Sequence, residues 1–384
     1  DGLAAVSTTS SEHVTEEFVQ QQAFTVLCEL VNDNVEYRAA LTELNGMALA
    51  FSVMGEHTRT GEVQERGVTF LAGLAGDSPR HCDALASQGG LELVLQAMEE
   101  HPSLMILQQD GCVLLQRLAV KNIGNRQKIA GLKGIERILA AMTEHKKAAD
   151  LQQFACMALR DLSWQCTGIG EEIGELGGVT LVLKAMMYHE QCIEIQEAAC
   201  GALRVLASDS EEIPFKVAED GGVQLVLKAV QTYRESTEVQ EHGFAVLSNL
   251  AWGCEETKEE IINLDGIQLV LLSMTSHPEV PRVQAFGCAS LQSLACETAE
   301  NRTKIGDLGG IELVIQAMRT HPRAANVQAF ACAALQSLAV KSRSNTRKLR
   351  GLGAVELIEE ALENNRRSLK LREFAEHVLD TLSS

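Results

Sequence analysis

The chain has 384 residues, of which 46% are hydrophobic and 4% aromatic, and it contains 6 prolines. This apolar content is too high for a disordered chain, and the shortage of aromatic and proline residues argues against a β-sandwich or barrel. The net charge of −19 argues against nucleic acid or an anionic membrane as a general partner, and the apolar stretches are shorter than the ~18 residues that span a bilayer. The apolar residues are mostly Ala, Leu and Met, so composition predicts an all-α protein.

A 44-residue repeat runs through the sequence. The segment 310–318 (Gly-Ile-Glu-Leu-Val-Ile-Gln-Ala-Met) has relatives whose first glycine recurs at a constant interval. These glycines, which define position 1 of each repeat, are Gly2, Gly46, Gly90, Gly134, Gly178, Gly222, Gly266 and Gly310, and the next step falls on Ala354. We therefore predict about nine repeats forming a single domain over residues 1–384.

Each repeat is predicted to contain three helices. The first covers positions 2–12, although residues 7–11 (Ser-Thr-Thr-Ser-Ser) interrupt it in the first repeat. The second and longest covers positions 17–31, with apolar residues at positions 18, 21, 22, 25, 26 and 29 that must be buried. A short third helix lies around position 40, and the recurrent glycine is expected to end it and turn the chain. One repeat cannot bury this stripe alone, so the repeats are expected to stack into a solenoid.

These features resemble armadillo repeats along essentially the whole chain. The matching features are the glycine turn, the Val-Gln opening of the long helix and endings such as residues 247–251 (Leu-Ser-Asn-Leu-Ala). The motifs Gly-Gly-Ile-Glu-Leu-Val and Ala-Cys-x-Ala-Leu-x-x-Leu-Ala are also similar to the armadillo region of leucine-rich-repeat kinases. The resemblance implies a right-handed superhelix whose concave groove binds extended peptides. HEAT repeats are the nearest alternative, but their signature lacks the short helix that ends in glycine.

Three recurrent polar positions are interpreted as structural. Position 23 holds Cys112, Cys156, Cys200, Cys288 and Cys332, which we expect to be reduced and buried, because layers ~10 Å apart cannot form disulfides. Seven histidines at position 12 are expected to lie at helix C-termini, and the glutamine at position 19 is expected to form a ladder between repeats. The sequon 301–303 is attributed to chance. With no catalytic, phosphate-binding or zinc motif, we expect no enzyme activity, metal or cofactor.

The candidate binding groove lies on one face of the long helices, at positions 20, 24, 27, 28 and 31. Armadillo proteins that bind nuclear-localisation signals carry Trp at position 24 and Asn at position 28 in many repeats, and only Asn249 matches here. Arginine and tryptophan are enriched in binding hot spots, so we predict that the groove site is centred on the arginines and tryptophans of this face. It comprises Arg117, Arg160, Asp161, Trp164, Arg204, Asn249 and Trp252. The alternative is that the arginines pair with Asp161 or nearby glutamates and that the tryptophans cover gaps between repeats.

A basic stretch near the end supplies a secondary candidate site. Residues 341–372 contain nine Lys or Arg and four Glu. The predicted patch comprises Arg343, Arg347, Lys348, Arg366, Arg367 and Lys370. It could dock an acidic partner or another copy of the chain, and the alternative is an ordinary solvated helix surface of mixed sign.

The sequence therefore predicts a non-catalytic protein-interaction scaffold that binds an extended acidic or phosphorylated segment along the groove. The main alternative is an architectural subunit of a cytoskeletal or axonemal assembly, and an import adaptor is disfavoured. We expect a cytoplasmic location, with nucleus or cytoskeleton as alternatives, and a monomer or one subunit of a hetero-complex. The chain begins with Asp rather than Met, which indicates processing or a longer parent protein.

Overall fold

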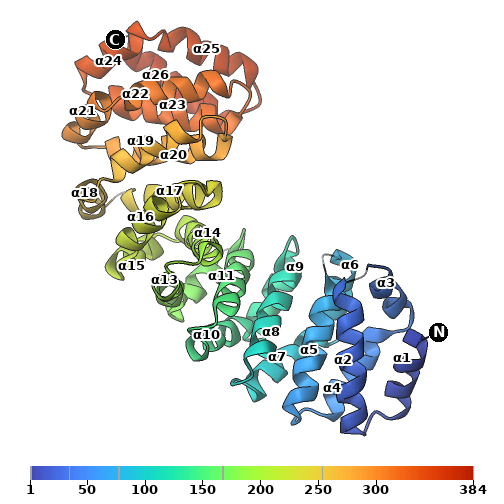
Figure 1. The fold of residues 1–384 in the computed structure, drawn as a ribbon. Coiled ribbons are helices and arrows are strands. Elements are labelled where there is room, and N and C mark those ends of the chain that lie inside the picture. Colours follow the sequence, from blue (N-terminus) through green and yellow to red (C-terminus); the bar gives the residue numbers. More distant parts are fainter. Residues whose placement is uncertain (1, 34, 77, 167, 253, 384) are drawn as a thin grey trace. The chain divides into compact units, whose positions relative to one another are not determined.

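The computed structural model describes residues 2–33, 35–76, 78–166, 168–252 and 254–383. In these ranges it contains 26 α-helices and no strand, so the predicted all-α fold is confirmed (Figure 1). The chain divides into two compact units, residues 1–209 with helices α1–α14 and residues 210–384 with helices α15–α26. The division falls inside one 44-residue repeat, after its long helix.

The helices are of three kinds, in a fixed order. The first helices of the repeats are α1 (Gly2–Glu12), α4 (Gly46–Glu56), α7 (Gly90–Glu100), α10 (Gly134–Glu144), α13 (Gly178–Tyr188), α16 (Gly222–Thr232), α19 (Gly266–Ser276), α22 (Gly310–Thr320) and α25 (Ala354–Asn364). The long helices are α2 (Glu17–Asp33), α5 (Gly61–Ala75), α8 (Met105–Ala119), α11 (Ala149–Ser163), α14 (Ile193–Asp209), α17 (Thr237–Ala251), α20 (Pro281–Ala295), α23 (Ala325–Ala339) and α26 (Leu369–Ser383). The short helices are α3 (Val35–Glu43), α6 (Pro79–Ser87), α9 (Ile123–Gly131), α12 (Ile169–Glu175), α15 (Glu212–Glu219), α18 (Glu255–Asn263), α21 (Ala299–Asp307) and α24 (Arg343–Gly351).

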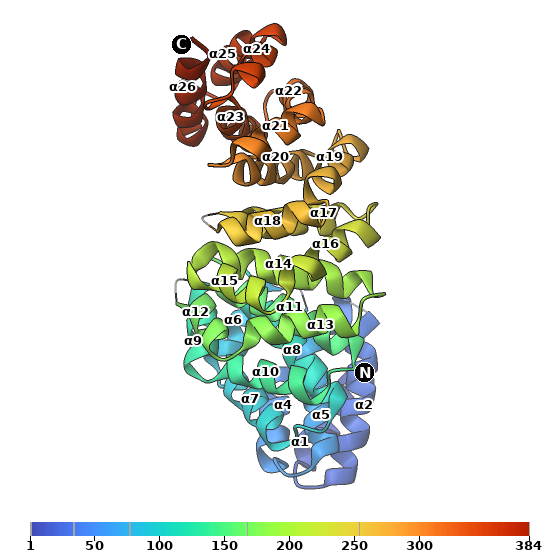
Figure 2. The same cartoon turned by 90° about the vertical axis from the view of Figure 1, so that its left-hand side faces the viewer.

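Within each unit, successive long helices pack side by side and the first helix of each repeat packs on its own long helix (Figures 1 and 2). The apolar stripe explains this packing: in α11, Leu151, Ala155, Leu159 and Leu162 are fully buried. Position 21 does not belong to that stripe, so this part of the prediction was wrong. Its phenylalanines in the last three repeats are only half-buried, because they lie at the edge between neighbouring long helices.

The turn between repeats is made by the residue before the recurrent glycine, and our prediction for that glycine was wrong. The preceding residue has a left-handed backbone, with φ between 55° and 90°, in every repeat junction that the structure describes from Asn45 to Gly353. The recurrent glycine itself is the first helical residue. In repeat 5 glycine is favoured there because a Cβ on Gly178 would lie 2.8 Å from the carbonyl oxygen of Ile173, although the last repeat carries Ala354 at the same position. Close packing, rather than backbone freedom, therefore explains this glycine.

The glutamine at position 19 binds inside its own repeat, so the predicted ladder between repeats was wrong. In repeat 4, Gln152 is 2% exposed, and its Nε2 donates to the carbonyl oxygens of Met142 (2.9 Å) and His145 (3.2 Å). The same pair of bonds joins all eight of these glutamines to the end of the first helix. Each glutamine thus satisfies carbonyls that a helix C-terminus leaves unpaired.

The histidine at position 12 makes the contact between repeats. Each of the seven histidines follows a first helix directly, as predicted. In the six repeats after the first that carry one, its Nε2 donates to a carbonyl 43 residues earlier, in the preceding repeat. His321, for example, donates to Pro278 at 2.7 Å. In the last repeat the Nδ2 of Asn365 donates to Pro322 at 2.9 Å, so an amide can replace the imidazole.

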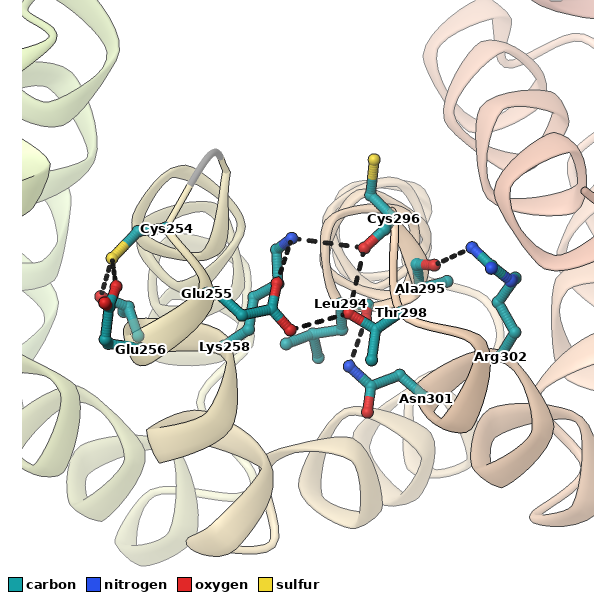
Figure 3. Close-up of polar contacts among 11 residues, drawn as sticks. Cys254, Glu255, Glu256, Lys258, Leu294, Ala295, Cys296, Thr298, Asn301 and Arg302 are labelled. Atoms are coloured by element: carbon teal, nitrogen blue, oxygen red, sulfur yellow. Dashed lines mark hydrogen bonds and ion pairs between the residues drawn. The ribbon is translucent and has the colours of Figure 1, made fainter.

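The short third helices carry buried polar side chains that cap the long helices (Figure 3). Asn301 is 7% exposed and donates to the carbonyl of Leu294 (3.0 Å), so its sequon does not present an accessible amide. Lys258, 2% exposed, donates to Glu255 and to the carbonyl of Cys296, both at 3.3 Å. A buried base at this position therefore links one repeat to the end of the next long helix.

Two further predictions have clear outcomes. The serine-rich stretch does not interrupt α1, because Ser10 is fully buried and its hydroxyl donates to Gln20 at 2.5 Å. The five cysteines at position 23 are buried free thiols, as predicted. Burial raises the pKa of each of these five thiols to about 12, so they stay protonated at neutral pH.

Candidate functional site

The two tryptophans lie at the ends of long helices, where they remain accessible. The helices α11 and α17 begin and end one residue earlier than predicted, so Trp164 and Trp252 directly follow them. Their exposed fractions are 41% and 60%. The carbonyl of Trp164 accepts a hydrogen bond from Nη1 of Arg126, a side chain that is 4% exposed on α9. Arg126 also donates to the carbonyl of Ala119 at 2.7 Å, so it positions Trp164 relative to the preceding repeat.

A polar row crosses the long helices of the first unit beside Trp164. The Nε2 of Gln116 on α8 donates to Oδ2 of Asp161 on α11 at 2.6 Å. Arg160 donates to both oxygens of the same carboxylate, at 2.8 and 3.2 Å. The guanidinium of Arg204 on α14 lies 5.4 Å from the centroid of the Trp164 ring, within range of a cation–π interaction. The structure thus places Arg160, Asp161, Trp164 and Arg204 together.

Arg117 lies on the same face but points toward the preceding repeat. Its Nη1 donates to the carbonyl of Ala72 on α5 at 2.5 Å. On the same side, the hydroxyl of Thr69 donates to Asp110 at 2.5 Å. Burial raises the pKa of Asp110 above its usual range, although the Thr69 hydrogen bond and the charge of Arg117 lower it in part. Near α5 and α8, the polar row therefore combines the positive charge of Arg117 with the carboxyl group of Asp110, which loses its proton less readily than usual.

The remaining groove predictions, Asn249 and Trp252, belong to the second unit. Asn249 is half-buried near the end of α17, and its carbonyl accepts from the backbone amide of Trp252 at 3.3 Å. The hydroxyls of Ser248 and Ser293 lie 3.0 Å apart, with the same 45-residue separation that joins Gln116 to Asp161. Both units therefore place positions 27 and 28 of neighbouring repeats in contact.

The secondary basic patch is divided between two ends of a helix. On α24, Lys348 pairs with Glu312 (2.7 Å), and the Nε of Arg350 donates to the carbonyl of Leu382 (2.7 Å), which fixes α24 beside the C-terminal end of α26. Lys370, in contrast, is in the first turn of α26, and Arg366 and Arg367 precede it. A 15-residue helix is about 22 Å long, so these residues do not form one patch with Arg343 and Arg347.

Among the described residues, no three or more His, Cys, Asp or Glu side chains are grouped closely enough to hold a metal ion. No helix in the described ranges is both long and apolar enough to cross a membrane. A pocket of about 270 Å³ lies beside the polar row, with Arg117, Lys121 and Asp83 in its lining.

Sequence reasoning missed several residues that build this face. Arg126 and Gln116 hold Trp164 and Asp161 in place, and neither was selected. One available signal was the Asn-Arg pair at positions 36 and 37, which occurs at 125–126 and again at 301–302. Another was Asp110, a charged residue at position 21, where an apolar residue was expected.

The stacked three-helix repeats and their conserved geometry define an α-solenoid of the armadillo type. The model of the family described as the LRRK2 ARM repeat matches residues 174–303, about a third of the chain. The predicted resemblance to armadillo repeats is therefore confirmed.

Solved structures extend the likeness in fold to the whole chain. An engineered protein from the Northeast Structural Genomics Consortium superposes with a TM-score of 0.72 and 20% identity, covering 100% of this chain and 99% of the other. A chain from work on a phosphorylation switch that controls the interaction between cadherin and beta-catenin has a TM-score of 0.63 and 17% identity, covering 100% and 83%. A second engineered protein has a TM-score of 0.55 and 22% identity, covering 65% and 96%. The curated proteins gave no match.

Proposed function

We propose that the chain is a non-catalytic protein-interaction scaffold that binds an extended acidic or phosphorylated segment of a partner along the long-helix face of its first unit. The observation that carries this proposal is the accessible Trp164 ring with the guanidinium of Arg204 5.4 Å from its centroid. An exposed aromatic ring beside an arginine is a combination typical of binding hot spots. Arg160 is already paired with Asp161. Its main role is therefore to hold that carboxylate in place, rather than to supply an unpaired positive charge to the partner segment.

The armadillo-type fold supports this proposal, since such solenoids present long, regular surfaces. One similar structure concerns an interaction between cadherin and beta-catenin that a phosphorylation switch controls, which is a precedent for a phosphorylated partner. Buried reduced cysteines favour a reducing compartment, and we propose the cytoplasm.

The test is affinity purification from the native source with a double variant, R160E/R204E. The matched control is K133E/K147E, which changes charge equally at exposed residues outside the row. We expect the double variant to lose its main partner, the control to retain it, and phosphatase treatment to weaken binding if the segment is phosphorylated. Both variants are first checked for a parental melting temperature. Retention of every partner by R160E/R204E would exclude this face, and a stoichiometric polymer in the eluate would favour the architectural role instead.

A further inference from the structure

A row of phenylalanines follows the N-terminal ends of the last three long helices. Phe286, Phe330 and Phe374 occupy position 21 of repeats 7, 8 and 9, on α20, α23 and α26, and all three are half-buried. The rings of Phe286 and Phe330 lie 6.1 Å apart between centroids, at an angle of 35°. Leu369, at the start of α26, is 76% exposed and extends this apolar edge.

In repeats 7 and 9, the side chain at position 17 reaches position 20 or 21 of the repeat before it. Arg282 pairs with Glu241 at 3.3 Å, and the Nζ of Lys370 lies 4.1 Å from the centroid of the Phe330 ring. Burial lowers the pKa of Lys370, and the nearby charge of Glu373 raises it in part. The chain therefore covers part of this edge with its own long side chains.

The cover is missing between α20 and α23. There position 17 is Asn326, whose side chain is short, and the structure has a pocket of about 290 Å³ lined by Phe286, Phe330, Pro281 and Asn326. We call this the Phe286–Phe330 pocket. Its floor is aromatic and its size suits a single large side chain rather than a whole small molecule.

The surroundings of the Phe286–Phe330 pocket are basic, although the protein is acidic overall. The segments 275–286, 319–330 and 363–374 contain seven Lys or Arg and three Glu, a net charge of +4 in a chain of net charge −19. Arg323, Arg366 and Arg367 are exposed, and within the described residues none of them forms an ion pair. The N-terminal ends of α20, α23 and α26 add positive potential at the same edge.

We propose that this edge of the second unit docks an acidic peptide segment of a partner protein, which inserts one aromatic or large aliphatic side chain into the Phe286–Phe330 pocket. The apolar pocket supplies an anchor, and the flanking arginines select the acidic flanks of the peptide. A basic anchor is disfavoured, because the edge already carries excess positive charge. A second copy of the chain is disfavoured too, because a pocket for one side chain lacks the area of a stable dimer interface. The proposal shares with the function above only the premise that the chain binds peptide segments.

The experiment selects binders for the purified whole chain from a random peptide library and measures fluorescein-labelled synthetic copies by fluorescence anisotropy at low salt. We expect the selected peptides to combine Asp or Glu with one aromatic residue or leucine. N326K fills the pocket with the residue that repeat 9 carries at the same position, and adds positive charge. A fall in affinity of about tenfold in N326K can therefore be attributed only to the filled pocket.

Charge is tested separately, with R323E/R366E against the matched control R343E/R347E at the other end of the long helices. We expect about tenfold weaker binding in the first variant and an unchanged affinity in the control. Peptides that bind N326K normally, or that are neutral or basic, would overturn the proposal. So would self-association in sedimentation that N326K abolishes, because the occupant would then be a second copy. Peptides lost in R160E/R204E but not in N326K would overturn this inference while supporting the function proposed above.

Discussion

At the scale of single residues, two recurrent side chains connect different backbone segments. Glutamine at position 19 closes the end of the first helix within a repeat, and histidine at position 12 donates to the repeat before it. The glutamine donates to carbonyls at the end of the first helix, and the histidine donates to a carbonyl in the turn that follows the first helix of the preceding repeat. One contact therefore closes the repeat, and the other joins it to its neighbour.

The glutamine contact gives a prediction for stability. In Gln152→Leu the carbonyl of Met142 loses its side-chain donor while remaining buried, so we expect the free energy of unfolding to fall by about 1–3 kcal/mol. The adjacent Gln153 is half-exposed, and Gln153→Leu is the control, with an expected change within about 0.5 kcal/mol. Urea unfolding of both variants tests this, and equal effects would contradict the role assigned to Gln152.

The buried thiols predict a decline in stability at alkaline pH. Their pKa of about 12 lies above the value of ~8.5 for an exposed thiol, so between these two values the unfolded chain binds fewer protons than the folded one. Stability is therefore complete below pH ~8.5 and is lost as pH rises toward 12, by up to ~1.4 kcal/mol per pH unit for each cysteine. Urea unfolding at several pH values should show a shallower decline for Cys156→Ala than for the parent, and identical slopes would exclude this cause.

The sequence revealed which polar positions recur but not their partners. In a strict repeat, every residue recurs after 44 positions, so a bond within a repeat and a bond between repeats leave the same periodic signal. That is why Gln152 was given a partner in the wrong repeat. The glycine at position 1 and the residue before it also recur together, so the repeat pattern did not reveal which of the two has the left-handed backbone of the turn.

At the scale of helices, the amphipathic pattern was sufficient to predict all three kinds of helix. The long-helix stripe repeats at helical spacing, and hydrophobicity predicts its buried face except at position 21, where the phenylalanines of the last three repeats are half-buried. The predicted binding site was harder to derive from the sequence, because its composition depends on which helix ends lie next to each other. Residues 341–372 form one basic stretch in sequence, yet α26 separates Arg343 and Arg347 from Arg366 and Arg367.

The turn between the third helix and the next first helix gives a prediction at this scale. Lys133 has φ of 63° there, whereas Gly177 fills the equivalent place with φ of 81°. A left-handed backbone costs a non-glycine residue roughly 1–2 kcal/mol, part of which the flexibility of glycine in the unfolded chain offsets. We expect Lys133→Gly to stabilise by about 0.5–1 kcal/mol and Gly177→Ala to destabilise by about 1 kcal/mol. Thermal unfolding tests both, and a destabilised Lys133→Gly would refute the strain argument.

At the scale of the whole molecule, each repeat inside a unit interacts mainly with its immediate neighbours. Stability in such a protein approximates a sum of repeat and nearest-neighbour contributions, and a disturbance should fade with distance along the chain. The histidine contacts allow this to be tested, because each one joins two adjacent repeats and the last repeat provides a natural replacement in Asn365.

We therefore expect His321→Ala to accelerate hydrogen exchange locally. The variant removes the bond to Pro278, so amides of α19 and α22 should exchange faster by about fivefold to tenfold, equivalent to ~1 kcal/mol. Amides of α4 and α7, in the first unit, should exchange at the parental rate. His321→Asn should restore most of the protection, because Asn365 makes the equivalent bond with an amide group. Mass spectrometry of exchanged peptides gives the result, and uniform acceleration throughout the chain would show that the protein unfolds as one cooperative body rather than repeat by repeat.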